Sequence, residues 1–199
     1  QDRIYTIPLA YERQVASKDD DSQIPETFHH GRPLKILFLG QVILRKGIKE
    51  LCEAIRLLED APIEWTIVGG GTAGLLDELS SLPQTTVTGA VTRTEVEQHY
   101  QDCDVFILPT HSDGFAITQL EAASFGLPII ASRFCGDVVI HQTNGLLLDT
   151  VTGTGIASTV EHLLATPRMV AKMTLAQKQR PNLGMHGLAQ HLLRLESYL

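Results

Sequence analysis

Short apolar runs recur at regular intervals between residues 34 and 150, and few of them contain alternating polar positions. Apolar runs of this length are typical of strands that are buried on both faces of a sheet. The six runs are LKILFLG (34–40), EWTIVG (64–69), TTVTG (85–89), DVFILPT (104–110), PIIAS (128–132) and GLLLD (145–149). We therefore expect six strands in this part of the chain.

The segments between these runs carry apolar residues at the spacing of a helix. Thr92 or Thr94 is the expected N-cap of the third helical segment, and Gly126 is expected to close the fourth. These segments are 47–58, 72–81, 93–103 and 116–126. Strands that alternate with helices form βαβ units. The sequence thus predicts an α/β fold with a Rossmann-like parallel sheet and helices on both faces.

The two ends of the chain follow different patterns. Residues 151–199 are helical in pattern only, so we expect extra C-terminal helices that pack on the sheet domain of residues 34–150. Residues 13–33 are polar and interrupted by proline and glycine, which predicts a linker or surface loop. Because the chain starts at Gln1 with the strand-like RIYTIPL, we expect residues 1–33 to lead from a missing N-terminal domain of the same chain.

The composition and net charge of the chain argue against some classes of function. The 199 residues are 43% hydrophobic and 20% charged, as in ordinary globular domains, and the net charge of −7 argues against a general nucleic-acid surface. Three cysteines without a C-x-x-C motif favour a reducing cytosol, so we expect a cytoplasmic protein. The eight histidines show no metal-binding spacing, and we expect no metal site.

A run of glycines in WTIVGGGTAG (65–74) matches G-x-G-x-x-G, the pattern that binds a dinucleotide pyrophosphate. That function requires the motif after the first strand and an acidic residue about 20 positions later. Here the motif follows the second strand, and the next strand ends in Thr88-Gly89 without an acid. The alternative is a tight strand-to-helix turn at the carboxyl edge of the sheet, where open α/β sheets bind ligands.

Two acids in LPTHSDGFAITQLEAASFGLPIIAS (108–132) form a stronger constellation. A helix that starts near Ala116 would place Asp113 in the loop before it and Glu121 on its second turn. Gly114 and Ala116 keep side chains small where backbone N–H groups emerge, which suits an anionic ligand at the helix N-terminus. These features predict a site for a phosphorylated polyol, with amides for phosphate and carboxylates for hydroxyl groups.

This segment resembles the E-x7-E signature of the group 1 (family 4) retaining glycosyltransferases, written E-G-F-G before a helix and G-L-P-V-I after it. FLGQVILRKGIKEL (38–51) is similar to the family's G-R-x4-K-G turn, with Gly40, Lys46 and Gly47 in register. Three further blocks agree in order: IVGGGTAGLLDEL, VTGAVTRTEVEQHYQDCDVFILPT and TNGLLLD. The resemblance covers about residues 34–165.

The resemblance implies the donor-binding half of a GT-B enzyme, which moves a hexosyl group from a nucleoside-diphosphate sugar with retention of configuration and without a metal or cofactor. By analogy, Glu121 holds the ribose, Asp113 a sugar hydroxyl, and Lys46, with Arg45, neutralises the diphosphate. The turn after Gly89 contacts a base of unknown identity. The implied donor-binding residues are Gly40, Gln41, Gly69, Gly70, Val91, His111, Gly114, Phe115, Ala116 and Glu121.

Three positions depart from the family pattern. Gln41 stands where the family has arginine, and Arg45 beside Lys46 is the candidate replacement. Asp113 is one methylene shorter than the family's glutamate, and Ala116 replaces a glycine. These departures concern the choice of sugar and the catalytic rate more than the fold.

Two other functions stay open at this stage: a non-catalytic nucleotide-sugar-binding module and an NAD-dependent Rossmann enzyme. The resemblance implies an acceptor that is a lipid, a polysaccharide or a small molecule. A lipid acceptor leaves open peripheral attachment of the full-length protein to the inner membrane.

Overall fold

A six-stranded sheet with strand order β3-β2-β1-β4-β5-β6 forms the centre of the computed structural model, which describes residues 24–179, 188–190 and 192–193. Every neighbouring pair of strands is parallel, which confirms the predicted sheet. The strands are β1 Leu34–Leu39, β2 Ile63–Val68, β3 Thr85–Gly89, β4 Val105–Leu108, β5 Ile129–Ala131 and β6 Gly145–Leu147.

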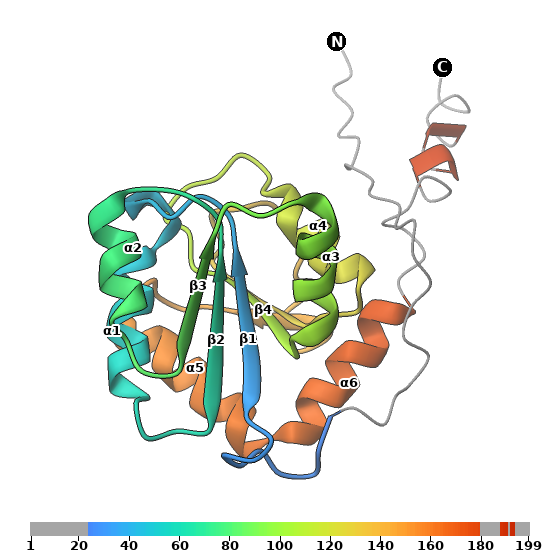
Figure 1. Ribbon diagram of the computed structural model, residues 1–199. Helices are drawn as coiled ribbons and strands as arrows, with labels where there is room; N and C mark the ends of the chain where they lie inside the picture. Colours follow the sequence, from blue (N-terminus) through green and yellow to red (C-terminus); the bar gives the residue numbers. More distant parts are fainter. Residues whose placement is uncertain (1–23, 180–187, 191, 194–199) are drawn as a thin grey trace.

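Helices cover both faces of the sheet (Figure 1), with α1, α2 and α5 on one side and α3, α4 and α6 on the other. They are α1 Ile48–Leu57, α2 Ala73–Ser80, α3 Arg93–Asp102, α4 Ile117–Ser124, α5 Gly153–Ala165 and α6 Pro167–Lys178, and a 3-10 turn η2 Leu44–Lys46 precedes α1. Of the two candidate N-caps, Thr92 and Thr94, Thr92 is correct, because it forms a capping box with Glu95 at the start of α3. Gly126 follows α4 with a φ of +80°.

The central strands are enclosed by these helices. In β1, Ile36, Leu37 and Phe38 are fully buried, although neighbouring residues of a strand point to opposite faces. Burial of each such side chain contributes about 1.5–3 kcal/mol relative to exposure. The continuous apolar pattern of the strands therefore follows from a sheet that is covered on both sides.

A buried polar cluster attaches α6 to the loop between β5 and β6. The Asn144 side chain accepts from the Ile140 N–H (2.6 Å) and donates to the Val138 carbonyl and to Gln177 Oε1 (both 3.2 Å). Gln177 Nε2 donates to the Leu127 carbonyl (3.0 Å) and to the Asn144 carbonyl (3.1 Å). Because buried amides are costly without partners, this satisfied cluster specifies where α6 docks.

Part of the expected linker packs on the domain instead of lying free. Phe28 is only 6% exposed, and the Arg32 guanidinium lies 5.9 Å from the centre of its ring. Arg32 also forms two hydrogen bonds, of 2.7 and 2.8 Å, to the carboxylate of Asp104, which is 7% exposed just before β4. A carboxylate that is this buried requires a charged partner, and residue 32 supplies it. The RIYTIPL segment and most of the last expected helix (187–199) lie outside the described residues.

All three cysteines are free and buried, and they pack in the core as small apolar residues. Burial is the main cause that raises the pKa of Cys52 to about 11 and that of Cys103 to about 12. Both thiols therefore stay protonated, and unreactive, at neutral pH.

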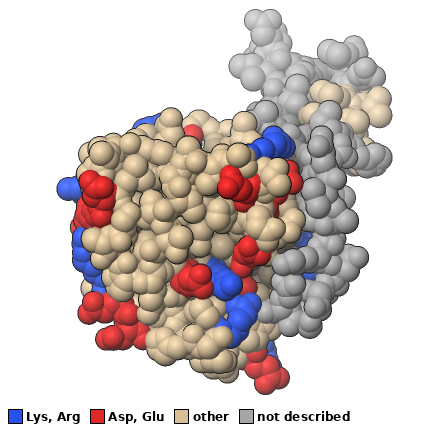
Figure 2. Space-filling model, viewed as in Figure 1, with Lys and Arg blue, Asp and Glu red and all other residues tan. Residues whose placement is uncertain are grey.

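The surface is mixed in charge. On the face seen in Figure 2, basic side chains are interspersed with acidic ones and form no continuous basic area. Among the described helices, none has the length and apolar character needed to cross a membrane.

Candidate functional site

The candidate site lies where the order of the strands changes direction. The chain adds β2 and β3 on one side of β1 and then returns to add β4 on the other side. β1 and β4 are neighbours at the centre, and the helices that follow them, α1 and α4, cover opposite faces (Figure 1). Open α/β sheets bind ligands in the crevice outside the carboxyl ends of such neighbouring strands, so the loops after β1 and β4 form the candidate site. Residues 40–47 form the first loop and residues 109–116 the second.

Backbone contacts hold the two loops together. The carbonyl of Arg45 accepts from Thr110 Oγ1 (3.0 Å) and from the backbone N–H of His111 (2.9 Å). In return, the Arg45 guanidinium donates to the Ser112 carbonyl (2.7 Å). Arg45, predicted as a phosphate cation, is thus anchored at one nitrogen beside the site.

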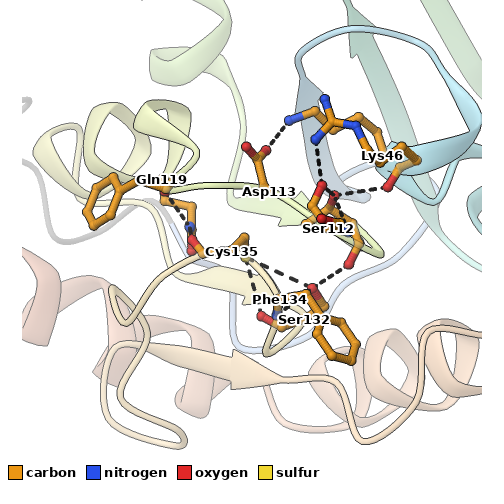
Figure 3. Close-up of polar contacts among 10 residues, drawn as sticks. Lys46, Ser112, Asp113, Gln119, Ser132, Phe134 and Cys135 are labelled. Atoms are coloured by element: carbon orange, nitrogen blue, oxygen red, sulfur yellow. Dashed lines mark hydrogen bonds and ion pairs between the residues drawn. The ribbon is translucent and has the colours of Figure 1, made fainter.

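Lys46 and Asp113 meet across the crevice. The Lys46 ammonium forms an ion pair with Asp113 Oδ2, and the two side chains are 13% and 16% exposed. Figure 3 shows Lys46 reaching from the first loop toward Asp113 on the second. The backbone N–H of Asp113 donates to the Phe134 carbonyl (2.8 Å), so a third loop, after β5, fixes its position. The resemblance implies that both residues contact the donor, and the structure brings the two side chains into direct contact with each other.

The N-terminus of α4 opens beside this pair without a side-chain cap. Asp113 precedes the helix and Glu121 lies on its second turn, as the sequence predicted. Gly114 has nothing within 4 Å of where a Cβ would be. Unpaired N–H groups at an open helix N-terminus attract anions, so this position suits a phosphate.

Ala116, the N-cap residue of α4, has the left-handed backbone conformation (φ 50°, ψ 78°). Non-glycine residues pay about 1–2 kcal/mol for this conformation. The family pattern has glycine here, which adopts it freely. The departure at this position therefore places strain directly at the candidate site.

We expect Ala116→Gly to stabilise the chain by up to about 1 kcal/mol, because the relieved strain exceeds the added entropy of the unfolded chain. Urea denaturation measures the change. The control is Ala171→Gly in the middle of α6, where the same substitution should cost about 1 kcal/mol. Destabilisation by both substitutions would contradict the strained conformation.

Glu121 has a different set of contacts. Its Oε2 accepts from the hydroxyl of Tyr100 on α3 (3.0 Å), and Tyr100 is buried and stacks on Phe125 with ring centroids 5.1 Å apart. The hydrogen bond orients the carboxylate from the side of α3. Tyr100 was not singled out from the sequence, where it reads as an ordinary core aromatic.

Glu50 is the second site residue that the sequence analysis missed. Its Oε1 lies 2.9 Å from Nε2 of His111, whose backbone is bonded to Arg45. Glu50 Oε2 is enclosed and has no hydrogen-bond partner within the described part of the chain. In the sequence, Glu50 is distinguished only by its position in the first turn of α1, where an acidic residue is usually a surface residue.

The glycine run has a structural role. A Cβ on Gly69 would lie 1.9 Å from the Gly40 carbonyl oxygen, and one on Gly71 would lie 2.1 Å from the Val42 carbonyl oxygen. The loops after β1 and β2 also share backbone hydrogen bonds, including Val42 N to the Gly70 carbonyl (3.0 Å). The glycines thus permit two loops to touch, and the run lies after β2 rather than at the β1–β4 crevice. This arrangement favours the tight-turn interpretation over the dinucleotide fingerprint.

The other predicted residues are spread along the same edge. Gln41 is exposed in the first loop, Phe115 is half-buried beside Gly136, and Val91 packs against the core in the turn after β3. Since β3 is two strands away from β1, Val91 is remote from the Lys46–Asp113 pair in the sheet order. Within the described residues, no group of three or more His, Cys, Asp or Glu could hold a metal ion.

A doubly wound parallel sheet of this strand order, covered by helices on both faces, defines a Rossmann-like α/β fold. The family model of the glycosyl transferases group 1 matches residues 33–166, and the chain belongs to this family. Its fold is the Rossmann-like half of the GT-B architecture.

Known proteins of this kind are similar to the chain over most of its length. A glycogen synthase of Mycobacterium tuberculosis is 29% identical over 157 residues, and the match covers 74% of this chain and 38% of the relative. An N,N'-diacetylbacillosaminyl-diphospho-undecaprenol alpha-1,3-N-acetylgalactosaminyltransferase of Campylobacter jejuni is 26% identical over 67% of this chain and 36% of the relative. The chain therefore spans well under half the length of these relatives.

A solved structure shows the same fold. HepE from Anabaena, in complex with UDP-glucose, superimposes with a TM-score of 0.68 at 16% identity. The match covers 85% of this chain and 50% of HepE.

Proposed function

We propose that this chain is the donor-binding half of a retaining glycosyltransferase, which moves a hexosyl group from a nucleoside-diphosphate sugar to an acceptor. The observation that carries the proposal is the crevice between β1 and β4, where Lys46, Asp113 and the uncapped start of α4 converge. A cation and open helix amides suit a diphosphate, and a carboxylate suits sugar hydroxyls.

Each group has one task in this proposal. Lys46 and the α4 amides stabilise the negative charge that develops on the leaving nucleoside diphosphate. Arg45, anchored to Ser112, supplies the second cation that Gln41 does not. Glu121, oriented by Tyr100, accepts the ribose hydroxyls, and Asp113 accepts a hydroxyl of the sugar. His111 lies beside the sugar, and the turn at Val91 contacts the base. The reaction requires no metal or cofactor.

The comparisons support partners of this kind. HepE is described with UDP-glucose, which makes UDP the first nucleotide to test. The Campylobacter relative is named for a diphospho-undecaprenol-linked sugar, which supports a lipid-linked acceptor and peripheral membrane attachment of the full-length protein. Because the matches cover only 38% and 36% of these relatives, we propose that an N-terminal domain supplies most of the acceptor site. Three free, buried thiols support a cytoplasmic location.

Calorimetric titration of the chain with UDP, GDP, ADP and NAD tests the proposal. We expect saturable binding of one nucleoside diphosphate, weakened roughly 10- to 100-fold by Glu121→Ala, since charged hydrogen bonds to the ribose are lost. Glu161→Ala, on the exposed surface of α5, removes the same charge and should leave affinity unchanged. Binding of NAD alone, or of none of the four, would overturn the proposal.

The exposed Gln41, in place of the family's arginine, favours a second candidate: a module that binds the donor without transferring its sugar. Sugar transfer by the full-length protein separates the two. Hydrolysis or transfer that depends on Glu121 would exclude the binding module, whereas donor binding with no turnover of any acceptor would favour it.

A further inference from the structure

The ion pair between Lys46 and Asp113 joins two groups that the proposed function assigns to different parts of the donor. We propose that Asp113 is an internal counter-ion, which holds Lys46 while no donor is bound and makes the site prefer the sugar-loaded donor over the spent nucleoside diphosphate. This inference rests on the proposed function and adds the order in which the two side chains are released.

The surroundings make the pair more than a surface contact. Both side chains are more than four-fifths buried, so water and salt screen their attraction less than they would on the surface. Both backbones are fixed: Lys46 N donates to the Ile43 carbonyl (3.0 Å), and Asp113 N to the Phe134 carbonyl (2.8 Å). Only the side chains are therefore available to change partners when a ligand enters.

A nucleoside diphosphate competes with Asp113 for the same ammonium. When its phosphate binds Lys46, the ion pair opens and the carboxylate is left facing a second anion in a partly desolvated crevice, which is unfavourable. A donor that still carries its sugar offers Asp113 a hydroxyl in exchange. The loaded donor thus compensates both partners, whereas the product compensates only Lys46. The pair would in this way speed release of the product.

Four forms of the chain test this mechanism by calorimetry with UDP, GDP or ADP, whichever binds: the parent, Asp113→Asn, Lys46→Met and the double variant. If the pair must open, Asp113→Asn should tighten binding of the nucleoside diphosphate roughly 5- to 10-fold. Lys46→Met should then lose more affinity in the Asp113→Asn background than in the parent. This difference isolates the contact, because independent charges would give additive effects.

The matched nucleoside-diphosphate sugar completes the test. Asp113→Asn should bind it no tighter than the parent does, so that the preference for the loaded donor falls. Asp60→Asn, an equal change of charge in the exposed loop between α1 and β2, should alter neither ligand. A parent that binds nucleoside diphosphate while Asp113→Asn binds it no better, or additive effects in the cycle, would overturn the counter-ion role alone. If no variant bound any nucleotide, the proposed function would fail and this inference with it.

Discussion

Replacing Gly69 with alanine is expected to cost the fold about 3 kcal/mol or more, or to prevent folding. The added Cβ would lie 1.9 Å from the Gly40 carbonyl oxygen, at a φ of +135° that side chains rarely adopt. Neither backbone can yield easily, because Gly40 N is bonded to the Val68 carbonyl (3.0 Å) and Gly69 N to the Gly89 carbonyl (2.8 Å). Relief of the clash requires that the loops above β1 and β2 separate, which places this substitution among the most damaging classes.

The next residue is a matched control. A Cβ on Gly70 has nothing within 4 Å, and Gly70 does not have a positive φ. Gly70→Ala should therefore change the free energy of unfolding by no more than about 0.5 kcal/mol. Chemical denaturation of both variants followed by circular dichroism measures the difference. Equal effects of the two substitutions would mean that the loops do not approach as closely as described.

The strands could be predicted from the sequence because strands that are buried on both faces are nearly continuous apolar runs. Burial on both faces leaves β4 entirely apolar and β1 with Lys35 as its single polar residue, and the resulting runs stand out from the helical spacing around them. The order of the strands follows from the βαβ alternation only in part. The sequence pattern does not show that β4 pairs with β1, and this pairing places the two site loops next to each other.

The packing of residues 28–32 on the domain could not be predicted from the local sequence, because it involves a residue far away in the chain. Arg32 and Phe28 lie in a polar stretch broken by proline and glycine, which resembles a loop by composition. Arg32 is held by Asp104, which is 72 positions away and needs a cation beside β4, and the Arg32 guanidinium in turn lies 5.9 Å from the centre of the Phe28 ring. A local pattern carries no trace of such a partner.

The candidate site could be proposed from the sequence where residue types and spacing suggest the chemistry, as at Lys46, Asp113 and Glu121. It was not predictable where a residue acts through geometry. Ala116 is a helix former by propensity, yet it has the left-handed conformation because the chain turns into α4 there. Glu50 reads as surface in α1, and only the fold brings His111 to it. Residues that orient other residues are therefore harder to identify in a sequence than residues whose type and spacing match a known pattern.

If the chain is the donor half of a glycosyltransferase, Lys46→Met should lower kcat/KM of the full-length protein by about 100-fold or more. Loss of one preorganised charge at a developing anion typically costs 10²–10³ in rate. Arg45, the second cation of the proposed site, does not take the place of Lys46, because its guanidinium is held by the Ser112 carbonyl (2.7 Å), and Gln41 offers no charge. Steady-state kinetics with the donor identified by titration measure the effect.

Lys49→Met is the control for this prediction, since it removes the same charge from an exposed position in the first turn of α1. It should keep kcat/KM within about twofold of the parent, as expected for a screened surface charge. Lys46→Met also leaves the Asp113 carboxylate without its partner, so the double variant Lys46→Met/Asp113→Asn serves to restore stability. If the double variant folds as well as the parent and is still far less active than Asp113→Asn alone, the loss from Lys46→Met lies in the chemistry. Full activity in Lys46→Met would remove this lysine from the mechanism and leave the α4 amides as the main stabiliser of the leaving group.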